Sequence, residues 1–337
     1  MRVLFVCSGN NETFKIVPFI KDQGESLRRH GIHIDYYPII GKGILGYFKA
    51  GLSLRKYLKA HSYDLVHAHY TFSGWAALVG AGKTPVVLSL MGDDAYGTFV
   101  GLNKVSLISR YSTVLTLLIQ PFVKAIICKA PNIEKYVYTK NKAYIIPNGI
   151  DIQKFKPERG ILKHNETGGK KRILFLGNRF NNRKNYALAK SAVEQLNLPD
   201  VEIINPYPIE HREIPKWLNA VDVLVLPSWM EGSPNVIKEG MACNCPIVAT
   251  DIGDVKWVFG DTEGCYISSF DENEFANKLR QALIFSDTKG RTNGIARIKE
   301  LGLDSATVAS RIIEVYNACL GRRNVKVKNA SVILDHY

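Results

Sequence analysis

The chain has 337 residues, more than a single hydrophobic core usually holds, and this length predicts two domains. Its hydrophobic content of 46% and charged content of 22% are those of a globular protein and exclude extended disorder. With 44 Lys and Arg against 31 Asp and Glu, the formal net charge is +13, which favours anionic partners. Phosphorylated small molecules, nucleic acids and anionic membrane faces all fit that charge.

The six cysteines favour a reducing compartment and no metal site. Only Cys243 and Cys245 are close together, and their spacing is not the C-x-x-C of zinc ligands. The apolar run Val3–Cys7 is too short for a signal peptide, and the longest apolar stretch, residues 105–123, is broken by Arg110 and Gln120. We therefore expect a cytoplasmic protein that does not span a membrane.

The first half of the chain alternates apolar strands with helical segments, which is typical of a doubly wound parallel sheet. The expected strands are Val3–Cys7, Ile32–Tyr37, Leu65–His67, Val86–Met91, Ala125–Cys128 and Tyr144–Ile146. A helix is expected over Phe14–His30, ended by Gly31. Residues 42–61 form a second, basic amphipathic helix, and this pattern fits either packing on the sheet or contact with an anionic membrane.

A polar segment from Glu158 to Arg172 resembles an interdomain linker, and a second strand and helix array follows it. The expected strands are Arg172–Leu176, Val201–Ile204, Val223–Leu226 and Pro246–Thr250, with helices at Tyr186–Leu196, Asn235–Ala242, Asp271–Phe285 and Ser305–Leu320. We predict an α/β fold of two Rossmann-like domains, 1–158 and 159–320, with parallel sheets facing across a cleft. The last helix has the alternative of packing on the first domain. The tail, 321–337, carries no strong pattern.

Residues 227–243 follow a buried strand and therefore lie where such sheets bind ligands. Pro234 suits a first helical turn and Ser233 suits its cap, so a helix N-terminus with free amides is expected there. Glu231 precedes that helix and Glu239 lies two turns inside it. Carboxylates bind vicinal hydroxyls well, but at this spacing Glu231 also fits a helix cap and Glu239 an ion pair with a lysine.

This run, EGSPNVIKEGMACNCPIVATDIGDV, resembles the Glu-x7-Glu donor-site signature of family 4 glycosyltransferases. Three further stretches resemble the same family in the right order. They are DLVHAHY at 64–70, IPNGIDIQKFKP at 146–157 and ILFLGNRFNNRKNY at 173–186. The resemblance covers nearly the whole chain, and several ordered motifs are far more specific than a lone glycine fingerprint.

The resemblance implies a GT-B fold and a retaining hexosyltransferase that uses a UDP- or GDP-sugar without a metal. By the same resemblance, Glu231 faces the transferred sugar and Glu239 binds the ribose hydroxyls. The residues near sugar and phosphate are then Gly232, Ser233, Pro234 and Asn235. The implied acceptor is a lipid-linked or polysaccharide glycan, as in polysaccharide biosynthesis, which makes peripheral contact with the cytoplasmic membrane face attractive.

The basic loop that opens at Gly177 is expected to neutralise the donor diphosphate as it leaves. Lys184 matches the lysine of the family, whereas its arginine is matched by both Arg179 and Arg183. Each of these cations also fits a solvated surface charge. Tyr207 follows a strand and is a candidate contact for the base.

On the acceptor side, Gly9 and Asn10 close the first strand in the loop that runs to Asn11, and His69 lies near a strand end. A packed core residue is the alternative role for His69. Asp93 is a candidate to orient an acceptor hydroxyl or accept its proton, as is its neighbour Asp94, and a turn or helix cap is the alternative. Met91 stands where the family commonly has a histidine, which argues against a His-based acceptor role at that position.

Two other functions fit the sequence less well. A nucleotide-sugar epimerase shares this fold, and fold alone does not separate the two activities. A non-catalytic basic binding protein fits the charge of +13, but no RNA-binding signature or aromatic stacking motif supports nucleic acid as the partner. Composition predicts no oligomeric state.

Overall fold

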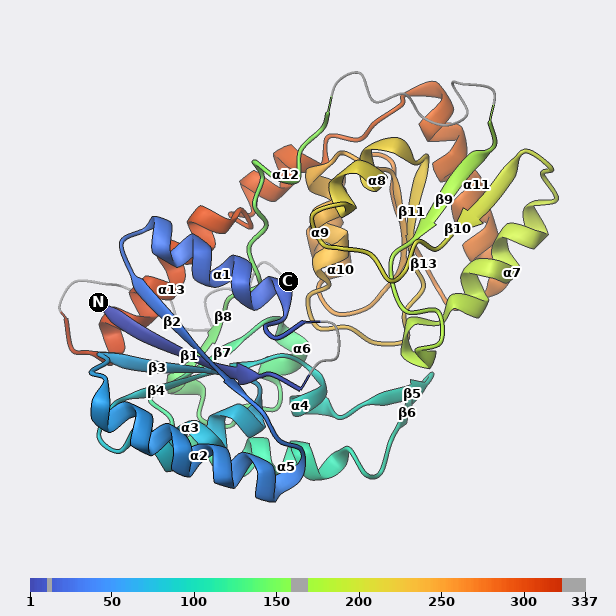
Figure 1. Ribbon diagram of the computed structural model, residues 1–337. Helices are drawn as coiled ribbons and strands as arrows, with labels where there is room; N and C mark the ends of the chain where they lie inside the picture. The colour runs from blue at the N-terminus through green and yellow to red at the C-terminus, as the bar shows by residue number, and fades with distance from the viewer. Residues whose placement is uncertain (11–13, 159–168, 323–337) are drawn as a thin grey trace. The chain divides into compact units, whose positions relative to one another are not determined.

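The computed structural model describes residues 1–10, 14–158 and 169–322, and the chain divides into two compact units (Figure 1). Unit 1 holds residues 1–98, 105–149 and the chain from 305 onward, and unit 2 holds residues 99–104 and 150–304. The division therefore falls at Gly149 instead of Glu158, and the last helix belongs to unit 1. Asn11, most of the expected linker (159–168) and the tail from 323 lie outside the described residues.

Unit 1 is built on a six-stranded sheet in the order β2-β1-β3-β4-β7-β8, with every pairing parallel. The strands are β1 (Arg2–Ser8), β2 (His33–Ile39), β3 (Leu65–His69), β4 (Val86–Leu90), β7 (Ala125–Cys128) and β8 (Ala143–Ile145). All six strands predicted here are confirmed, with ends shifted by one or two residues. The central strands β3 and β4 are buried along their whole length because helices cover both faces of the sheet.

The helices of unit 1 are α1 (Pro18–Arg29), α2 (Gly43–Ala60), α3 (Thr71–Ala81), α4 (Asp93–Tyr96), α5 (Arg110–Ile119), α6 (Pro131–Glu134) and α13 (Ser305–Cys319), with short 3-10 turns η1 (Gln120–Phe122) and η2 (Lys140–Lys142). Figure 1 shows α1 and α13 side by side, and both contribute to a core that contains Val3 and Phe5 of β1. The helix predicted from Phe14 begins only at Pro18, which suits a first helical turn. On the other side α2 packs closely on α3, because a Cβ at Gly51 would lie 2.8 Å from Val79 Cβ.

Unit 2 is built on a five-stranded parallel sheet in the order β10-β9-β11-β12-β13. The strands are β9 (Lys171–Phe175), β10 (Val201–Ile204), β11 (Val223–Leu226), β12 (Ile247–Thr250) and β13 (Cys265–Ser268). Four of them were predicted. The fifth, β13, is a short, half-buried edge strand that the sequence analysis did not predict. Unit 2 also includes the strand β5 (Phe99–Gly101), which pairs with β6 (Lys104–Val105).

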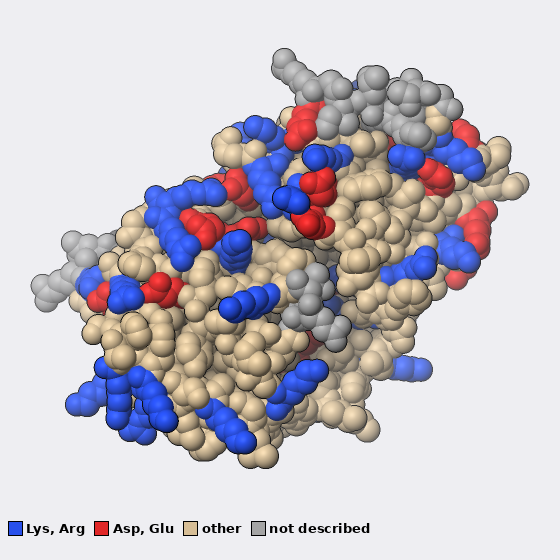
Figure 2. Space-filling model, in the orientation of Figure 1, with Lys and Arg blue, Asp and Glu red and all other residues tan. Residues whose placement is uncertain are grey.

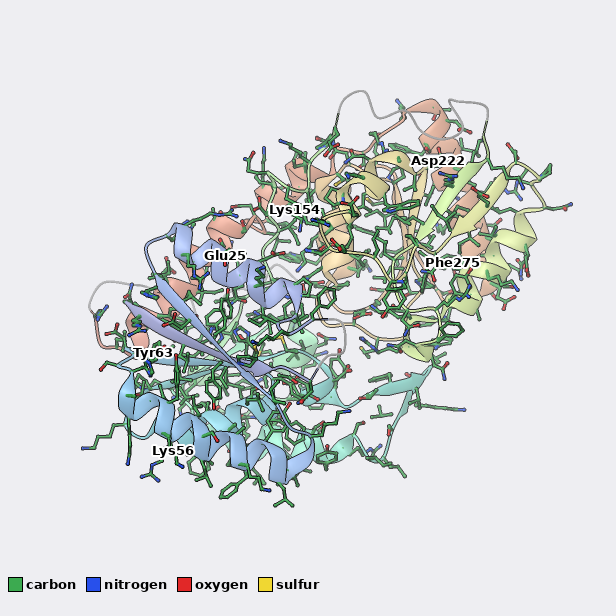
Figure 3. All side chains as sticks on the ribbon, in the orientation of Figure 1. Glu25, Lys56, Tyr63, Lys154, Asp222 and Phe275 are labelled. Atoms are coloured by element: carbon green, nitrogen blue, oxygen red, sulfur yellow. The ribbon has the colours of Figure 1, made fainter. Side chains whose placement is uncertain are left out.

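Helices cover both faces of the unit 2 sheet. They are α7 (Tyr186–Leu196), α8 (Ile214–Ala220), α9 (Asn235–Ala242), α10 (Val255–Phe259), α11 (Glu272–Thr288) and α12 (Gly294–Glu300), with the 3-10 turn η4 (Asn182–Lys184). One core joins the sheet to α7 and to α11, whose Phe275 is labelled in Figure 3. The other core joins it to α9, α10 and α12 through Met241, Val258 and Ile298. Among the described helices, none is both long and apolar enough to cross a bilayer.

Candidate functional site

Three loops of unit 2 meet at the carboxyl-end edge of the sheet, where parallel α/β sheets bind ligands. The loop after β11 lies between the loops after β9 and β12 and is hydrogen-bonded to both. Trp229 N donates to Arg183 O at 2.8 Å, and Asp254 N donates to Gly232 O at 3.1 Å. These backbone bonds fix the three loops as one surface.

A carboxylate flanked by two cations lies at the centre of this surface. Lys184 Nζ donates to Glu231 Oε1 at 2.7 Å, and Arg183 Nη1 donates to Glu231 Oε2 at 2.9 Å. Burial alone would raise the pKa of Glu231, but the positive charges of Lys184 and Arg183 outweigh it and hold that pKa below the usual value. Glu231 is therefore ionised at neutral pH and accepts hydrogen bonds.

The two arginines that the sequence left as alternatives have different surroundings. Arg183 reaches both Glu231 and the carbonyl oxygen of Met230, and its side chain is 19% exposed. Arg179 is exposed and lies over the ring of Phe180, 5.0 Å from the ring centroid. Geometry thus brings Arg183 and Lys184 together with Glu231.

The loop leads into the N-terminus of α9 at Pro234, which is the residue before the first helical position. The predicted cap by Ser233 is wrong, since no side chain caps α9. The hydroxyl of Ser233 instead accepts a hydrogen bond from the buried Lys238 Nζ at 2.9 Å. Burial lowers the pKa of Lys238 to about 8 against the opposing charges of Asp254 and Glu239. Burial likewise raises the pKa of Asp254 to about 6, although Lys238 and Ser233 stabilise its charged form.

Gly253 permits the close packing of the loops after β11 and β12. Its φ is +58°, and a Cβ there would lie only 2.0 Å from Gly232 O. The loop after β9 is held in a comparable way, because Asn205 Nδ2 donates to the carbonyl oxygens of Phe175 and Gly177 at 2.9 Å each. Neither Asn205 nor Gly253 was singled out individually from the sequence.

Glu239 is the second buried carboxylate of the site. It lies on α9, and its Oε1 is 2.8 Å from His211 Nε2. Lys154, labelled in Figure 3, places its Nζ 2.9 Å from the other ring nitrogen of His211. His211 was not singled out from the sequence, because it lies in a loop 28 positions before Glu239. Lys154 lies inside the stretch 146–157, but no role was assigned to its side chain. Tyr207, in the same loop as His211, is about half exposed.

In unit 1, the candidates after β1 support the local backbone. A Cβ at Gly9 would lie 2.8 Å from the side chain of Ile40, so this glycine allows close approach to the chain after β2. Asn10 bridges the same segment, donating from Nδ2 to Gly41 O at 2.7 Å and accepting from Gly41 N at 2.9 Å. These contacts account for the presence of Gly9 and Asn10 without requiring that either residue binds a substrate.

The two aspartates after β4 differ in role. Asp94 is buried, and its carboxylate accepts from the amides of Met91 and Gly92 at 2.9 Å each and of Thr71 at 3.1 Å. Burial raises its pKa to about 6, and those amides oppose the rise. Asp94 therefore fixes the turn, while the half-buried Asp93 is the acceptor-side candidate of the pair.

His69 is a core residue of unit 1. Its ring packs 4.6 Å from that of Phe5 and 4.3 Å from that of His67, and neither of its nitrogens has a hydrogen-bond partner in the described structure. Burial, with a contribution from Lys129, lowers its pKa well below the usual value, so it is neutral at pH 7. His67 in contrast is satisfied by Tyr316 and Ser89.

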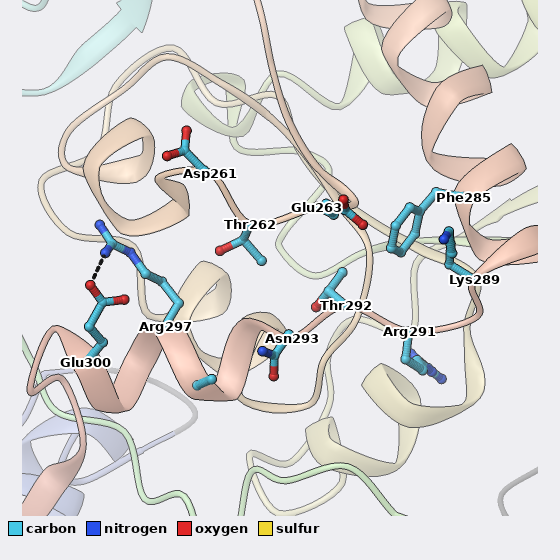
Figure 4. Close-up of a pocket in the computed structure, with 11 residues that line it drawn as sticks. Asp261, Thr262, Glu263, Phe285, Lys289, Arg291, Thr292, Asn293, Arg297 and Glu300 are labelled. Carbon is cyan, nitrogen blue, oxygen red and sulfur yellow. Dashed lines mark ion pairs between the residues drawn. The ribbon is translucent and has the colours of Figure 1, made fainter.

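A hollow of about 800 Å³ opens at the other edge of the unit 2 sheet, before β13 (Figure 4). It is lined by Asp261, Thr262, Glu263, Phe285, Lys289, Arg291, Thr292, Asn293, Ala296, Arg297 and Glu300. Among its charged groups, Arg297 pairs with Glu300, and Arg291 donates to the carbonyl oxygen of Leu218. Across the described residues, no three His, Cys, Asp or Glu side chains come together as a metal site.

Residues 2–154 match Glycosyltransferase Family 4, and residues 167–284 match Glycosyl transferases group 1. A UDP-Gal:alpha-D-GlcNAc-diphosphoundecaprenol alpha-1,3-galactosyltransferase from Escherichia coli is 27% identical over 272 residues, which cover 68% of this chain and 69% of that enzyme. A putative teichuronic acid biosynthesis glycosyltransferase from Bacillus subtilis is 26% identical over 58% of this chain and 55% of its own length. A D-inositol 3-phosphate glycosyltransferase from Xylanimonas cellulosilytica is 28% identical over 137 residues, only 32% of its length.

Solved structures share the fold over almost the whole chain. Sucrose-phosphate synthase from Thermosynechococcus elongatus superposes with a TM-score of 0.78 at 16% identity, covering 96% of this chain and all of that one (100%). Anabaena Alr3699/HepE in complex with UDP gives a TM-score of 0.71 at 15% identity, covering 94% of this chain and 100% of that one. The predicted GT-B class, with two parallel-sheet α/β units, is confirmed.

Proposed function

Since the chain belongs to the family 4 glycosyltransferases, we propose that it moves a hexose from a UDP-sugar to a lipid-linked or polysaccharide glycan with retention of configuration. The observation that carries the proposal is the contact of Glu231 with Lys184 and Arg183 beside the N-terminus of α9. An anion-binding surface and a hydroxyl-binding carboxylate thus lie together at the ligand edge of the unit 2 sheet.

The diphosphate of the donor is proposed to bind Lys184, Arg183 and the backbone amides at the start of α9. When the anomeric C–O bond breaks, the bond's electron pair leaves with the diphosphate, whose negative charge grows. Fixed cations and helix amides stabilise such developing charge without reorganising. Because these side chains supply the positive charge at the site, the proposal includes no metal.

Glu231 is proposed to accept hydrogen bonds from hydroxyls of the transferred sugar. Its lowered pKa keeps it ionised, which suits an acceptor of hydrogen bonds and not a general acid. In this structure both its oxygens are bound to cations. Donor binding would exchange those partners, with the cations turning to phosphate and Glu231 to the sugar.

Glu239 is proposed to bind the ribose hydroxyls, with His211 holding the carboxylate in place at 2.8 Å. The choice of UDP rests on relatives and not on a contact of this chain: the Escherichia coli enzyme uses UDP-Gal, and the Anabaena protein was solved with UDP-glucose. Residues of unit 1, with Asp93 as the candidate for orienting a hydroxyl, are proposed to bind the acceptor at the cytoplasmic side of the membrane.

The testing experiment incubates the protein with a panel of UDP- and GDP-sugars, first alone and then with lipid-linked glycan acceptors. We expect one UDP-sugar to stabilise the protein against heat, since a ligand of the native state raises its stability with occupancy. Glu239→Ala should lose that shift, and the glycan product should keep the anomeric configuration of the donor by NMR. Isomerisation of the donor without acceptor would instead show an epimerase, and an inverted product would refute retention.

A further inference from the structure

Helix α5 buries polar side chains and exposes apolar ones, which reverses the arrangement of an ordinary surface helix. Its inward side buries Ser112 and Thr116 together with Ile119, and Gln120 follows them in η1. Thr116 Oγ1 donates to Asp94 O at 2.6 Å, and Gln120 Nε2 donates to Tyr136 O at 2.8 Å, so these polar groups are satisfied inside. The outward side is apolar, and surface helices in water show the opposite arrangement.

The outward apolar residues continue onto helix α2. Its inward side packs on α3 through Gly51 and Leu54, which are buried. Between the two helices, the rings of Tyr47, Phe72 and Tyr111 form a chain with centroid distances of 5.3 and 5.7 Å, which joins α2 to α5. The outer apolar face consists of Ile40, Ile44, Leu45, Phe48, Leu52, Leu107, Ile108, Tyr111, Val114, Leu118 and Phe122, all exposed.

This apolar face is set in a strongly basic part of the chain. Residues 36–133 contain ten Lys and Arg against three Asp, a formal charge of +7 out of the +13 of the whole chain. Five exposed basic residues accompany the outer side of α2, namely Lys42, Lys49, Arg55, Lys56 and Lys59. In the space-filling view the region over α2 and α5 shows Lys and Arg among uncharged residues, without Asp or Glu (Figure 2). Lys56 lies on the outer side of α2 in Figure 3.

We propose that the outer apolar face of α2 and α5 docks on an anionic lipid bilayer, lying in the headgroup region without crossing it. Apolar side chains flanked by Lys and Arg are the chemistry that binds an anionic lipid surface. If this face were simply exposed to water, the apolar outward side of α5 would have no explanation. If it bound an acidic protein, its eleven exposed apolar side chains would have none. The face belongs to unit 1, so the proposal does not depend on the donor site.

The test measures sedimentation of the full chain with vesicles of phosphatidylcholine alone or mixed with phosphatidylglycerol. A charge variant carries Lys49→Gln, Arg55→Gln, Lys56→Gln and Lys59→Gln. The protein should bind the mixed vesicles and not the neutral ones, and binding should weaken when salt rises from about 0.15 M to about 1 M. The charge variant should bind at least about tenfold more weakly, because each basic residue contributes near an anionic surface.

A matched control removes the same charge from unit 2 by changing Lys190, Lys216, Lys289 and Lys299 to Gln, all of which are exposed. Its vesicle binding should equal that of the unchanged protein. An apolar variant, Phe48→Ser with Leu118→Ser, should also lose binding while keeping the melting temperature, since both side chains are exposed. UDP binding by calorimetry should be unchanged in all three variants, which separates this proposal from the donor site.

Three outcomes would overturn the proposal. Equal binding to neutral and mixed vesicles would remove the role of charge. An equal loss of vesicle binding in the unit 2 control would show that binding depends on the net charge of the protein and not on this face. A dimer in solution that Phe48→Ser dissociates, with no vesicle binding by the unchanged protein, would make the face a contact between two copies of this chain.

Discussion

Replacing Lys184 by Met removes one of the two cations that contact Glu231 while keeping the length of the side chain. We expect the variant to bind UDP more weakly than the unchanged protein. The pKa of Glu231 should also rise, because burial would then be opposed only by Arg183 and by the hydrogen bond from Ser228. Arg179→Met is the matched control, since Arg179 belongs to the same loop but is exposed and lies over Phe180.

The size of the effect follows from the surroundings of each cation. The Lys184 side chain is 21% exposed, so its bond to phosphate would be a largely desolvated, charge-assisted one. Such a bond contributes about 1.5–3 kcal/mol, which corresponds to about 10- to 100-fold in affinity. An exposed cation such as Arg179 contributes about 0–1 kcal/mol, or less than about fivefold.

Isothermal titration calorimetry with UDP measures both variants directly. Glu231→Gln tests the same assignment by an opposite change in UDP affinity. Loss of the carboxylate charge makes Lys184 and Arg183 available to bind phosphate. UDP affinity should therefore rise in that variant while sugar transfer falls. An unchanged UDP affinity in Lys184→Met, or a larger loss in Arg179→Met, would refute this assignment of the diphosphate site.

Three further predictions concern the same unit. Glu239→Ala should weaken UDP binding about tenfold through loss of the ribose contact, whereas Glu263→Ala, at the opposite edge of the sheet, should leave it unchanged in the same titration. Gly253→Ala should lower the free energy of unfolding by more than about 3 kcal/mol, because strain at positive φ adds to a clash with Gly232 O, whereas Gly290→Ala, with open space around it, should cost about 1 kcal/mol in urea unfolding. The lowered pKa of Lys238, about 8, means that the unfolded chain binds more protons between about pH 8 and 10.5. Stability should therefore rise with pH in that window by up to about 3 kcal/mol, and melting curves of Lys238→Met should lack the rise.

Most of the fold could be predicted from the sequence because its strands and helices correspond to local apolar patterns. Strands such as Val223–Leu226 are buried on both faces and stand out from their polar flanks. The edge strand β13 is half-buried and did not stand out. The place of α13 could not be decided from its own pattern, because an amphipathic helix does not specify which sheet it covers.

Residues of the candidate site could be singled out from the sequence where they lie in one stretch of chain, and not where the site depends on contacts between separate loops. Glu231, Glu239 and Lys184 were identified from motifs. The contact of Arg183 with Glu231 joins residues 48 positions apart, and sequence alone could not rank it above Arg179. His69 ends β3 and Asp94 follows β4, which are places where ligand-binding residues occur, but burial gives both residues structural roles.

The return of α13 to unit 1 has a consequence for synthesis of the chain. A ribosome completes all six strands of the first sheet by Ile145, yet Ser305–Cys319 emerges only after the whole of unit 2. Until then, Phe5 of β1 lacks the part of its helical cover that α13 provides, and His67 lacks the hydroxyl of Tyr316, 2.6 Å away in the finished protein. Unit 2 has a contiguous core of its own and can fold first. The unit encoded first is therefore finished last, and a nascent chain that stops near residue 150 carries a partly uncovered apolar sheet face prone to aggregation.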